Sequence, residues 1–417
     1  MYDVLRLGYP VKTFVSLQRS EITVEQIEAS DLGSPRFKAN PYPFYARLRA
    51  EAPVCRTSLF NRPAWLVTRY DDVLLVLKDE RFAKEWTSRM PWMPGFAKSA
   101  TRSMLNMDPL DHTRLRRLVK KAFTPRLIDG LRERIQIACD DLLDAAVPNG
   151  RIELVRGYAL PLPLAVIGEL LGIPAQDRLR LHSWARSMIE GSTIIDVLRA
   201  LPYMWLVVRY FRKLFAHRRK QPLDDLVTAL VQAEEEGDKL SEDELLSMVL
   251  LLLLAGYETT VNLIASGTLA LLQHPEQRDR LQQNPTLTES AIEELLRYTS
   301  PGDIATIRLA REDVTIGSVT IRRGDLVLTV LGSANHDESQ FPDPETLDIT
   351  REPNRHLAFG QGVHYCLGAE LARLEGQIAL RTLFCRFPNL RLAEAPESLR
   401  WRKALFFRGL ERLHVAF

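Results

Sequence analysis

The sequence predicts a mainly α-helical protein with small β-sheets. Helical periodicity of apolar residues dominates from about residue 110 to 300. Alternating apolar residues, which are typical of strands, occur only in short segments on either side of this region. The 417 residues are 46% hydrophobic, enough to bury a large core, and they contain no repeat, low-complexity tract or obvious linker. We therefore expect one mostly helical body with its strands at one side.

The first expected element is a short hairpin, in which residues 54–60 and 64–68 bracket Asn61-Arg62-Pro63. A helix is expected to begin with residues 71–78, directly after this hairpin. Towards the C-terminal end of the helical region, and after it, helix-like and strand-like patterns alternate. There we expect helices at about residues 288–298 and 369–384, strands at residues 314–321 and 325–331, and a terminal hairpin between residues 389 and 417.

The longest expected helix begins at a Ser-x-x-Glu capping box, Ser241-Glu242-Asp243-Glu244. Its apolar pattern then continues without a breaker to His274, just before Pro275. At 1.5 Å per residue, about thirty residues span roughly 45 Å, which crosses a globular domain. The apolar run at residues 248–256 is shorter than the about twenty residues of a membrane span, and Glu258 follows it. We expect a buried core helix.

Charge and cysteine content exclude several classes of protein. The net charge of +2 is too small to indicate a nucleic-acid partner. Charged residues within the first dozen positions leave no apolar stretch for a signal sequence or a membrane span. The four cysteines are widely spaced and form no CxxC pair, so we expect a reducing, cytoplasmic compartment. Three of them are expected to be packing residues: Cys55, Cys139 and Cys385.

The fourth cysteine, Cys366, lies in the glycine-rich string Phe359-Gly360-Gln361-Gly362-Val363-His364-Tyr365-Cys366-Leu367-Gly368, just before a helical run. A sulfur at a helix N-terminus meets unpaired N–H groups and the positive end of the helix dipole, which favours a thiolate that can bind a metal. The glycines let the backbone approach a large flat object closely. A lone cysteine is more often a small buried hydrophobe, but such a residue does not need three glycines and an aromatic at fixed offsets.

This string resembles the haem-binding loop of the cytochrome P450 family, in which the cysteine is the proximal ligand of the haem iron. An axial thiolate pushes electron density onto iron and favours O–O cleavage. The resemblance covers the chain from about Asn40 to its end. It implies a variable lead-in over residues 1–35, a single domain over residues 36–417, the family's triangular helical prism with small β-sheets, and haem b. The missing anchor points to the soluble, bacterial-type branch. The cofactor-binding residues implied in the loop are Phe359, Gly360, His364, Cys366 and Gly368.

A second resemblance lies inside the long helix, where Ala255-Gly256-Tyr257-Glu258-Thr259-Thr260 is similar to the family's oxygen-binding segment. Helical periodicity places Leu252, Ala255, Gly256 and Thr259 on one face. The resemblance implies that Ala255 and Gly256 border the haem, that Gly256 leaves room for dioxygen, and that Glu258 and Thr259 relay protons as the catalytic pair. The alternatives are ordinary back-bonding for Thr259 and a surface carboxylate for Glu258.

Polar residues elsewhere match two further family features. Glu294 and Arg297, spaced i,i+3 on a helix, resemble the buried structural pair that Arg351 joins, although such a pair is usually a solvated salt bridge. Arg355 departs from the proline that is common at its position. Haem propionates need cationic or donor partners when buried. By resemblance these donors are His112, Arg116, Arg308 and His364.

The resemblance also implies a substrate pocket, roofed by the apolar loop at residues 86–104. No lysine or arginine stands at the wall positions, which favours a neutral apolar ligand over a small anion. The implied residues are Trp92 and Phe96 in the roof, Leu252 and Ala255 in a helical wall, Ile304 and Ala305 in a strand wall, and Leu405 and Phe406 at the far tip.

The activity implied is insertion of one oxygen atom of O2 into a hydrophobic small molecule, with electrons from NAD(P)H through a ferredoxin or flavodoxin. The alternatives are a peroxide-driven peroxygenase, in which arginine and proline typically replace the acid–alcohol pair, and a non-catalytic haem sensor or interaction protein. Two basic groups could bind partners, or could be solvated helix faces. They are Arg114, Arg117, Lys120 and Lys121 for the electron donor, and Arg209, Arg212, Lys213, Arg218, Arg219 and Lys220 for a carboxylate or a carrier protein.

Overall fold

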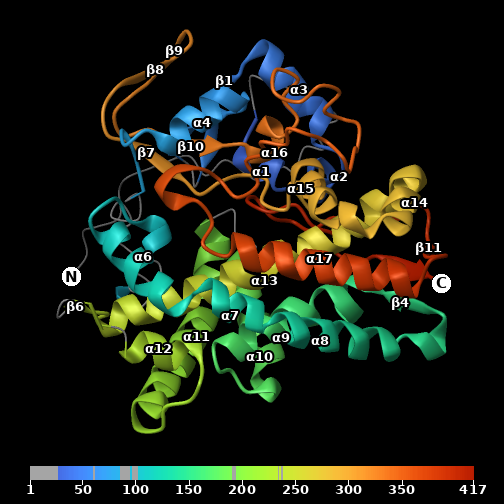
Figure 1. Cartoon of the computed structure of the whole chain (residues 1–417). Coiled ribbons are helices and arrows are strands. Elements are labelled where there is room, and N and C mark those ends of the chain that lie inside the picture. The colour runs from blue at the N-terminus through green and yellow to red at the C-terminus, as the bar shows by residue number, and fades with distance from the viewer. Residues whose placement is uncertain are drawn as a thin grey trace, which may run out of the picture.

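The computed structural model describes residues 27–59, 62–84, 94–95, 102–189, 194–232, 234–235 and 238–417. Within these ranges the chain is mostly helical, and the main sheet and a separate hairpin lie at one side of the helices (Figure 1). The predicted class, mainly α with small β-sheets, is confirmed.

The central element is α13 (Glu242–Gln273), which packs against α9, α15 and α17 (Figure 1). Ser241 accepts a hydrogen bond from the Glu244 backbone N–H, and the Glu244 carboxylate accepts one from the Ser241 N–H, so the predicted capping box is present. α13 is long and apolar enough to cross a membrane, but 72% of its most apolar window is buried within the protein. It is the buried core helix that the sequence predicts.

Most of the other helices lie around α13 (Figure 1). The helices predicted at residues 71–78, 288–298 and 369–384 are confirmed, with ends that differ by two residues at most. The α-helices are α1 (Ala29–Leu32), α2 (Pro35–Ala39), α3 (Tyr42–Glu51), α4 (Tyr70–Lys78), α6 (Asp111–Ala122), α7 (Pro125–Gly130), α8 (Arg132–Asp144), α9 (Pro161–Leu170), α10 (Ala175–Ile189), α11 (Ile194–Lys220), α12 (Leu226–Gln232), α14 (Pro275–Gln283), α15 (Thr288–Thr299), α16 (Leu331–Ala334) and α17 (Ala369–Arg386).

The main sheet has five strands in the order β1-β2-β10-β7-β3. The first two form the predicted hairpin, with Val54 opposite Val67, but Arg62 and Pro63, predicted in the turn, belong to the second strand. β10, predicted at residues 325–331, pairs in parallel with β2. The strands are β1 (Val54–Leu59), β2 (Arg62–Val67), β3 (Phe82–Ala83), β7 (Arg308–Ala310) and β10 (Leu326–Thr329).

The smaller sheets correct the prediction in two places. Residues 314–321, predicted as one strand, form the hairpin of β8 (Val314–Ile316) and β9 (Val319–Ile321). The turn is at Gly317, whose φ of +57° suits glycine. The terminal hairpin of β11 (Arg391–Leu392) and β12 (His414–Ala416) is confirmed, but β4 (Arg151–Glu153) adds a third strand that was not predicted. A further short pair is β5 (Glu234–Glu235) and β6 (Asp238–Lys239).

The end of the predicted lead-in belongs to the packed fold. Ile27 and Leu32 are buried in a cluster that also contains Leu59, Leu66 and Leu328 of the main sheet. α1 and α2 also lie within or next to the predicted lead-in, and Ser34 caps α2 through the Phe37 N–H. The packed structure therefore begins before residue 36.

Candidate active site

Cys366 lies between a short 3-10 turn, Gly362–His364, and the start of α17. Its backbone N–H donates to the Phe359 carbonyl oxygen at 3.0 Å, which closes the loop. Gly360 and Gly362 have φ of +68° and +76°, and a Cβ on Gly362 would lie 3.1 Å from the Leu77 carbonyl oxygen. Gly368 has an ordinary φ of −89°, and an added Cβ there would meet nothing within 4 Å. The backbone conformation therefore requires glycine at residues 360 and 362, whereas residue 368 could carry a side chain without a clash.

The Cys366 side chain has an accessible surface, although protein atoms surround the thiol closely. Burial raises the pKa of this thiol above its ordinary value, against the lowering effects of the Gly368 backbone N–H, Arg116 and Arg373. The helix N-terminus does act in the predicted direction, but it does not outweigh burial. The predicted effect of the helix start on the thiol is therefore present, as the lowering of its pKa by the Gly368 N–H.

The remaining cysteines differ from one another. Cys55 and Cys139 are buried, and burial raises the pKa of these thiols to about 11 and about 12, so both are inert packing residues as predicted. Cys385 is exposed near the end of α17, so its predicted packing role is wrong. Its neighbour Phe384 is buried instead.

The four donors predicted for propionates lie close together, although they come from three distant segments. The His112 ring on α6 is tilted against the His364 ring, with 4.3 Å between ring centroids. Arg116, one turn later on α6, donates from Nη2 to the Tyr365 carbonyl oxygen at 2.8 Å. Arg308 on β7 donates to the Phe82 and Leu77 carbonyl oxygens at 3.3 and 3.1 Å. Burial, and then the neighbouring cations, lower the pKa of His112 to about 4 and that of His364 to about 2.

A fifth cation, Lys84, belongs to the same cluster and was missed in the sequence. It follows β3, is fully buried, and its Nζ donates to Thr306 Oγ1. Burial, followed by repulsion from Arg308, lowers the pKa of Lys84 well below its ordinary value, and Lys84 in turn lowers that of His364. No sequence pattern predicts this position, because β3 is only two residues long.

The cation cluster of Lys84, His112, Arg116, Arg308 and His364 leaves polar atoms without partners. His112 Nδ1 and Arg308 Nε are buried and have no hydrogen-bond partner among the described residues. Buried donors without partners are rare, and concentrated positive charge is costly unless an anion balances it. The cluster therefore fits a buried anionic group, such as a pair of carboxylates.

The predicted acid–alcohol pair is part of the middle of α13. Thr259 Oγ1 donates to the Ala255 carbonyl oxygen at 3.2 Å, the back-bonding noted as the alternative. Ala255 is exposed and Thr259 is half-buried, although most of the following residues on α13 are buried. Glu258 is buried and forms an ion pair with Arg402, so the alternative of a surface carboxylate is excluded.

Gly256 serves helix packing. A Cβ at this position would lie 2.9 Å from Ile167 Cδ1 of α9, so a larger residue would require the end of the Ile167 side chain to move. The space beside the Gly256 Cα is filled by Ile167, which gives this glycine a structural reason other than the predicted room for dioxygen.

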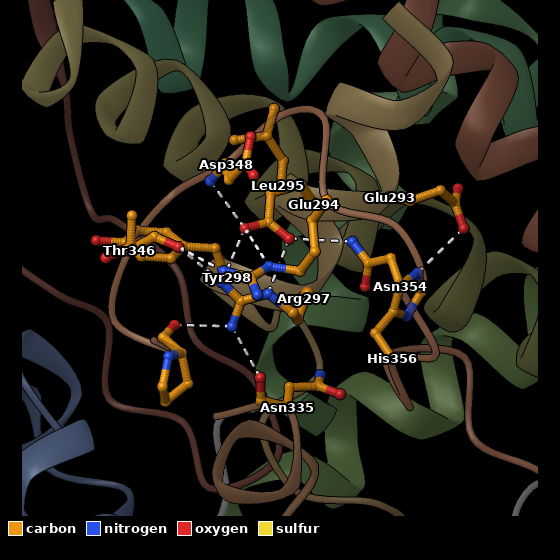
Figure 2. A network of polar contacts seen from close by, with 12 residues as sticks. Glu293, Glu294, Leu295, Arg297, Tyr298, Asn335, Thr346, Asp348, Asn354 and His356 are labelled. Atoms are coloured by element: carbon orange, nitrogen blue, oxygen red, sulfur yellow. Dashed lines mark hydrogen bonds and ion pairs between the residues drawn. The ribbon is translucent and has the colours of Figure 1, made fainter. Parts of the chain in front are cut away.

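A buried polar network joins α15 to the segment before the cysteine loop (Figure 2). Arg297 donates to both Glu294 oxygens at 2.8 Å, and neither side chain is exposed. Arg351 Nε donates to Glu294 Oε1 at 3.2 Å, so both predicted arginines contact Glu294. Arg297 also donates to three backbone carbonyl oxygens, those of Asn335, Pro344 and Thr346.

The residues predicted to line the substrate pocket differ in how deeply they are buried. Ile304 and Leu405 are 3% and 1% exposed and pack in the core beside β2 and β10, whereas Ala305 and Phe406 are half-buried. The Ile304 backbone N–H donates to the Phe406 carbonyl oxygen at 3.3 Å, so the strand wall and the tip are adjacent. Leu252 is half-buried on α13, and Trp92 and Phe96 lie outside the described residues. Among the predicted wall residues, Leu252, Ala255, Ala305 and Phe406 remain candidates, and Ile304 and Leu405 are core residues.

Ion pairs occupy one member of the α6 group and three of the α11 group, where Arg212 pairs with Asp243 and Arg219 with Glu242. Arg114 on α6 pairs with Glu244 of α13, while Arg117, Lys120 and Lys121 are exposed. Arg218 on α11 is buried and pairs with Asp225 at 2.5 Å.

Comparison with known proteins agrees with the geometry. Residues 206–400 match the Cytochrome P450 family model. The chain is 45% identical to the polyketide biosynthesis cytochrome P450 PksS of Bacillus subtilis (strain 168), over 91% of this chain and 96% of PksS. A structure of PksS aligns with a TM-score of 0.87, covering 92% of this chain and 98% of that chain. A structure of P450BioI in complex with acyl carrier protein ligated to hexadec-9Z-enoic acid is 40% identical, with a TM-score of 0.84 over 92% of this chain and 99% of that chain.

The fold and the cysteine loop thus define a haem-iron oxidoreductase. The chain belongs to the cytochrome P450 family, as the sequence resemblance implies, and its relatives are monooxygenases of the bacterial type.

Proposed function

We propose that the protein is a monooxygenase that binds haem b through Cys366 and inserts one oxygen atom of O2 into a neutral, hydrophobic small molecule. The observation that carries this proposal is the cation cluster next to the cysteine loop, with its buried His112 Nδ1 and Arg308 Nε atoms. Two propionates supply the negative charge that such a cluster needs. A tetrapyrrole held there is within reach of the loop, because Arg116 contacts Tyr365, the neighbour of Cys366.

The residues of the chain would divide the chemistry as follows. Cys366 is the thiolate ligand of the iron, and Lys84, His112, Arg116, Arg308 and His364 hold the propionates. When bound, the haem activates dioxygen with two electrons, so that one oxygen atom enters the substrate and the other leaves as water. Glu258 brings protons from the protein interior, and the Thr259 hydroxyl passes them on when it leaves the Ala255 carbonyl oxygen. Overall, one substrate, O2, NAD(P)H and a proton give the hydroxylated or epoxidised product, water and NAD(P)+.

The peroxide-driven alternative is less well supported, because the chain keeps an acid and an alcohol at residues 258 and 259. The test is substrate-dependent NAD(P)H consumption with surrogate ferredoxin and flavodoxin partners. We expect product to form with NAD(P)H and O2. Product with hydrogen peroxide alone would favour the peroxygenase, and haem binding without turnover in either assay would favour a sensor.

The substrate class follows from the side chains that remain at the pocket. Leu252, Ala255, Ala305 and Phe406 carry no charge, which favours a terpenoid, steroid, fatty acyl chain or macrocycle over a small polar acid. Neutral lipophiles and small acids should be screened by the shift of the haem spin state. Phe406→Ala should weaken the binding of lipophiles, with Leu179→Ala as the control at an exposed position on α10. Tight binding of small acids alone would contradict this class.

We infer that the electron donor is an acidic ferredoxin or flavodoxin that docks on the exposed positive residues of α6, in the cytoplasm. Arg117, Lys120 and Lys121 are exposed at the C-terminal part of this helix, and Arg116 on the same helix contacts the cysteine loop. Charge reversal at Lys120 and Lys121 should slow reduction mainly at low ionic strength, where screening is weakest. A rate of reduction that does not depend on salt would remove this interface.

A carrier-bound substrate is a second candidate, because P450BioI is bound to an acyl carrier protein in its complex. Arg209, on the same helix as the exposed Trp205, stacks over that ring at 5.3 Å. If an acidic carrier docks on α11, then Arg209→Glu should weaken the binding of an acyl carrier protein in a titration, and the free acyl chain should bind unchanged.

A further inference from the structure

Glu258 is satisfied at only one of its two oxygens. Its side chain is 1% exposed, and Oε1 accepts a hydrogen bond from Arg402 Nη1, whose side chain is 11% exposed. Oε2 is buried and has no hydrogen-bond partner among the described residues. A buried carboxylate in this state costs stability.

The buried ion pair of Glu294 and Arg297 shows a carboxylate in the same protein whose two oxygens both accept hydrogen bonds. Glu294 receives two N–H groups of Arg297 in the forked geometry, and it receives further donors from Arg351, Asn354 and the Asp348 backbone. Glu258 has one such contact among the described residues. This contrast argues that the pairing of Glu258 with Arg402 serves more than stability.

Arg402 belongs to the hairpin whose tip carries Phe406. Its backbone N–H donates to the Gly409 carbonyl oxygen at 3.0 Å, next to the bridge between Trp401 and Leu410. This hairpin lies directly against α13, because a Cβ on Gly409 would lie 1.9 Å from the Asn262 side-chain oxygen. Asn262 is one helical turn after Glu258, so the hairpin covers the face of α13 that carries the acid.

The tip of the same hairpin is fastened to the sheet side of the molecule. The Phe406 carbonyl oxygen accepts from the Asp303 backbone N–H at 2.9 Å, and the Leu405 carbonyl oxygen accepts from Lys38 Nζ at 3.0 Å. Lys38 and Asp303 form a buried ion pair at 2.5 Å. The segment from Arg402 to Phe406 thus connects Glu258 to a wall of the proposed substrate pocket within five residues.

We propose that Arg402 is a positioning residue for proton delivery: it holds Glu258 by Oε1, so that Oε2 is left to take up a proton and pass it toward Thr259. This inference rests on the monooxygenase function proposed above. A proton would enter on Oε2 and leave from Oε2 to the Thr259 hydroxyl as that hydroxyl gives up its own proton, which returns Glu258 to the carboxylate that Arg402 stabilises. Because the same hairpin carries Phe406, the position of the acid depends on the loop that contacts the substrate.

The test compares Arg402→Met and Arg402→Lys with Arg400→Met. Arg400 is an exposed residue of the same hairpin, so its replacement removes an equal charge without touching Glu258. Each haem-loaded variant is assayed for the thiolate-type band of the reduced carbon monoxide complex, for product formed per NAD(P)H, and for the solvent isotope effect on turnover. We expect Arg402→Met to keep the band but to lower product formation at least about tenfold, with a larger isotope effect. Arg402→Lys should regain part of this loss, and Arg400→Met should match the wild type.

A double-mutant cycle separates positioning from a structural effect. If Arg402 acts through Glu258, Arg402→Met should cause no further loss of coupled turnover in a Glu258→Gln background. A tenfold loss in both backgrounds, or wild-type coupling and isotope effect in Arg402→Met, would overturn the proposal. If Arg402→Met does not bind haem, Arg402→Lys is used instead. A yield of product per NAD(P)H that lies between the yields of the wild type and of Glu258→Gln supports the proposal, and a wild-type yield overturns it. A wild-type protein without any NAD(P)H-driven product would instead refute the proposed function.

Discussion

Replacement of Arg297 should destabilise the protein more than the loss of any exposed arginine. Arg297→Met removes five hydrogen bonds, two to Glu294 and three to the carbonyl oxygens of Asn335, Pro344 and Thr346 (Figure 2). Removal of one partner of a buried pair typically costs about 3–5 kcal/mol, because it leaves an uncompensated charge. In Arg297→Met, Glu294 still accepts hydrogen bonds from Arg351, Asn354 and the Asp348 N–H. The cost of its unpaired charge should therefore lie at the lower end of this range.

The three carbonyl oxygens that lose their donor in Arg297→Met lower the free energy of unfolding further. A buried acceptor without a donor costs about 1–3 kcal/mol, so a total near 5 kcal/mol is expected for Arg297→Met. Folded domains have a free energy of unfolding of about 5–15 kcal/mol, so the variant would retain little stability. Arg297→Lys keeps the charge but cannot reach both carboxylate oxygens and the three carbonyl oxygens, so its loss should be intermediate.

The assay is urea unfolding of the haem-loaded protein, followed by far-ultraviolet circular dichroism. The matched control is Arg322→Met, because the side chains of Arg322 and its partner Asp313 are 70% and 49% exposed and such pairs contribute about 0–1 kcal/mol. Equal unfolding midpoints for Arg297→Met and Arg322→Met would refute the view that this network holds the segment before the cysteine loop.

Three further outcomes test separate parts of the site. Thr259→Ala should bind haem and reduce oxygen but release more peroxide per product, and unchanged coupling would mean that the hydroxyl only back-bonds to Ala255. Burial alone would raise the pKa of Glu293, but hydrogen bonds from Arg373 and His356 lower it to about 2. Because the unfolded pKa is near 4.3, the stability that Glu293 contributes is complete above that pH and is lost as pH falls toward 2. The difference in urea midpoint between wild type and Glu293→Gln should therefore shrink from pH 6 to pH 3, and a constant difference would contradict this assignment. Lys84→Met should stabilise the haem-free chain by removing a buried charge, yet speed haem release to apomyoglobin, and an unchanged release rate would exclude Lys84 from the propionate cluster.

Local sequence signals predicted the elements whose causes are local. The capping box at Ser241 and Glu244 fixes the start of α13 within the first turn, and Pro275 fixes its end. The hairpin of β1 and β2 likewise follows from residues within fifteen positions of one another. β8 and β9 were predicted as one strand, although the sequence carries a local turn signal, Gly317-Ser318, at which the apolar positions shift from 314 and 316 to 319 and 321.

Features that depend on distant contacts could not be predicted from the same signals. β4 is three residues long and exists because β12, more than 250 residues later, pairs with it. Lys84 and Arg402 carry no motif, and they join the site only because β3 and the C-terminal hairpin pack against it. The reason for Gly256 also came from tertiary packing, since Ile167 lies on a different helix. The resemblance pointed to the cysteine loop, to Glu258 and Thr259 and to the Glu294 network, but not to the residues that contact them.

The most direct test of the account is the spectrum of the reduced carbon monoxide complex of the wild type and of Cys366→His. We expect the wild type to show the long-wavelength Soret band of a thiolate-ligated haem, and Cys366→His to lose that band while it still binds haem. Cys55→Ala, Cys139→Ala and Cys385→Ala should keep the band. A thiolate-type band in Cys366→His, or its absence in the wild type, would contradict the assignment of Cys366 as the iron ligand.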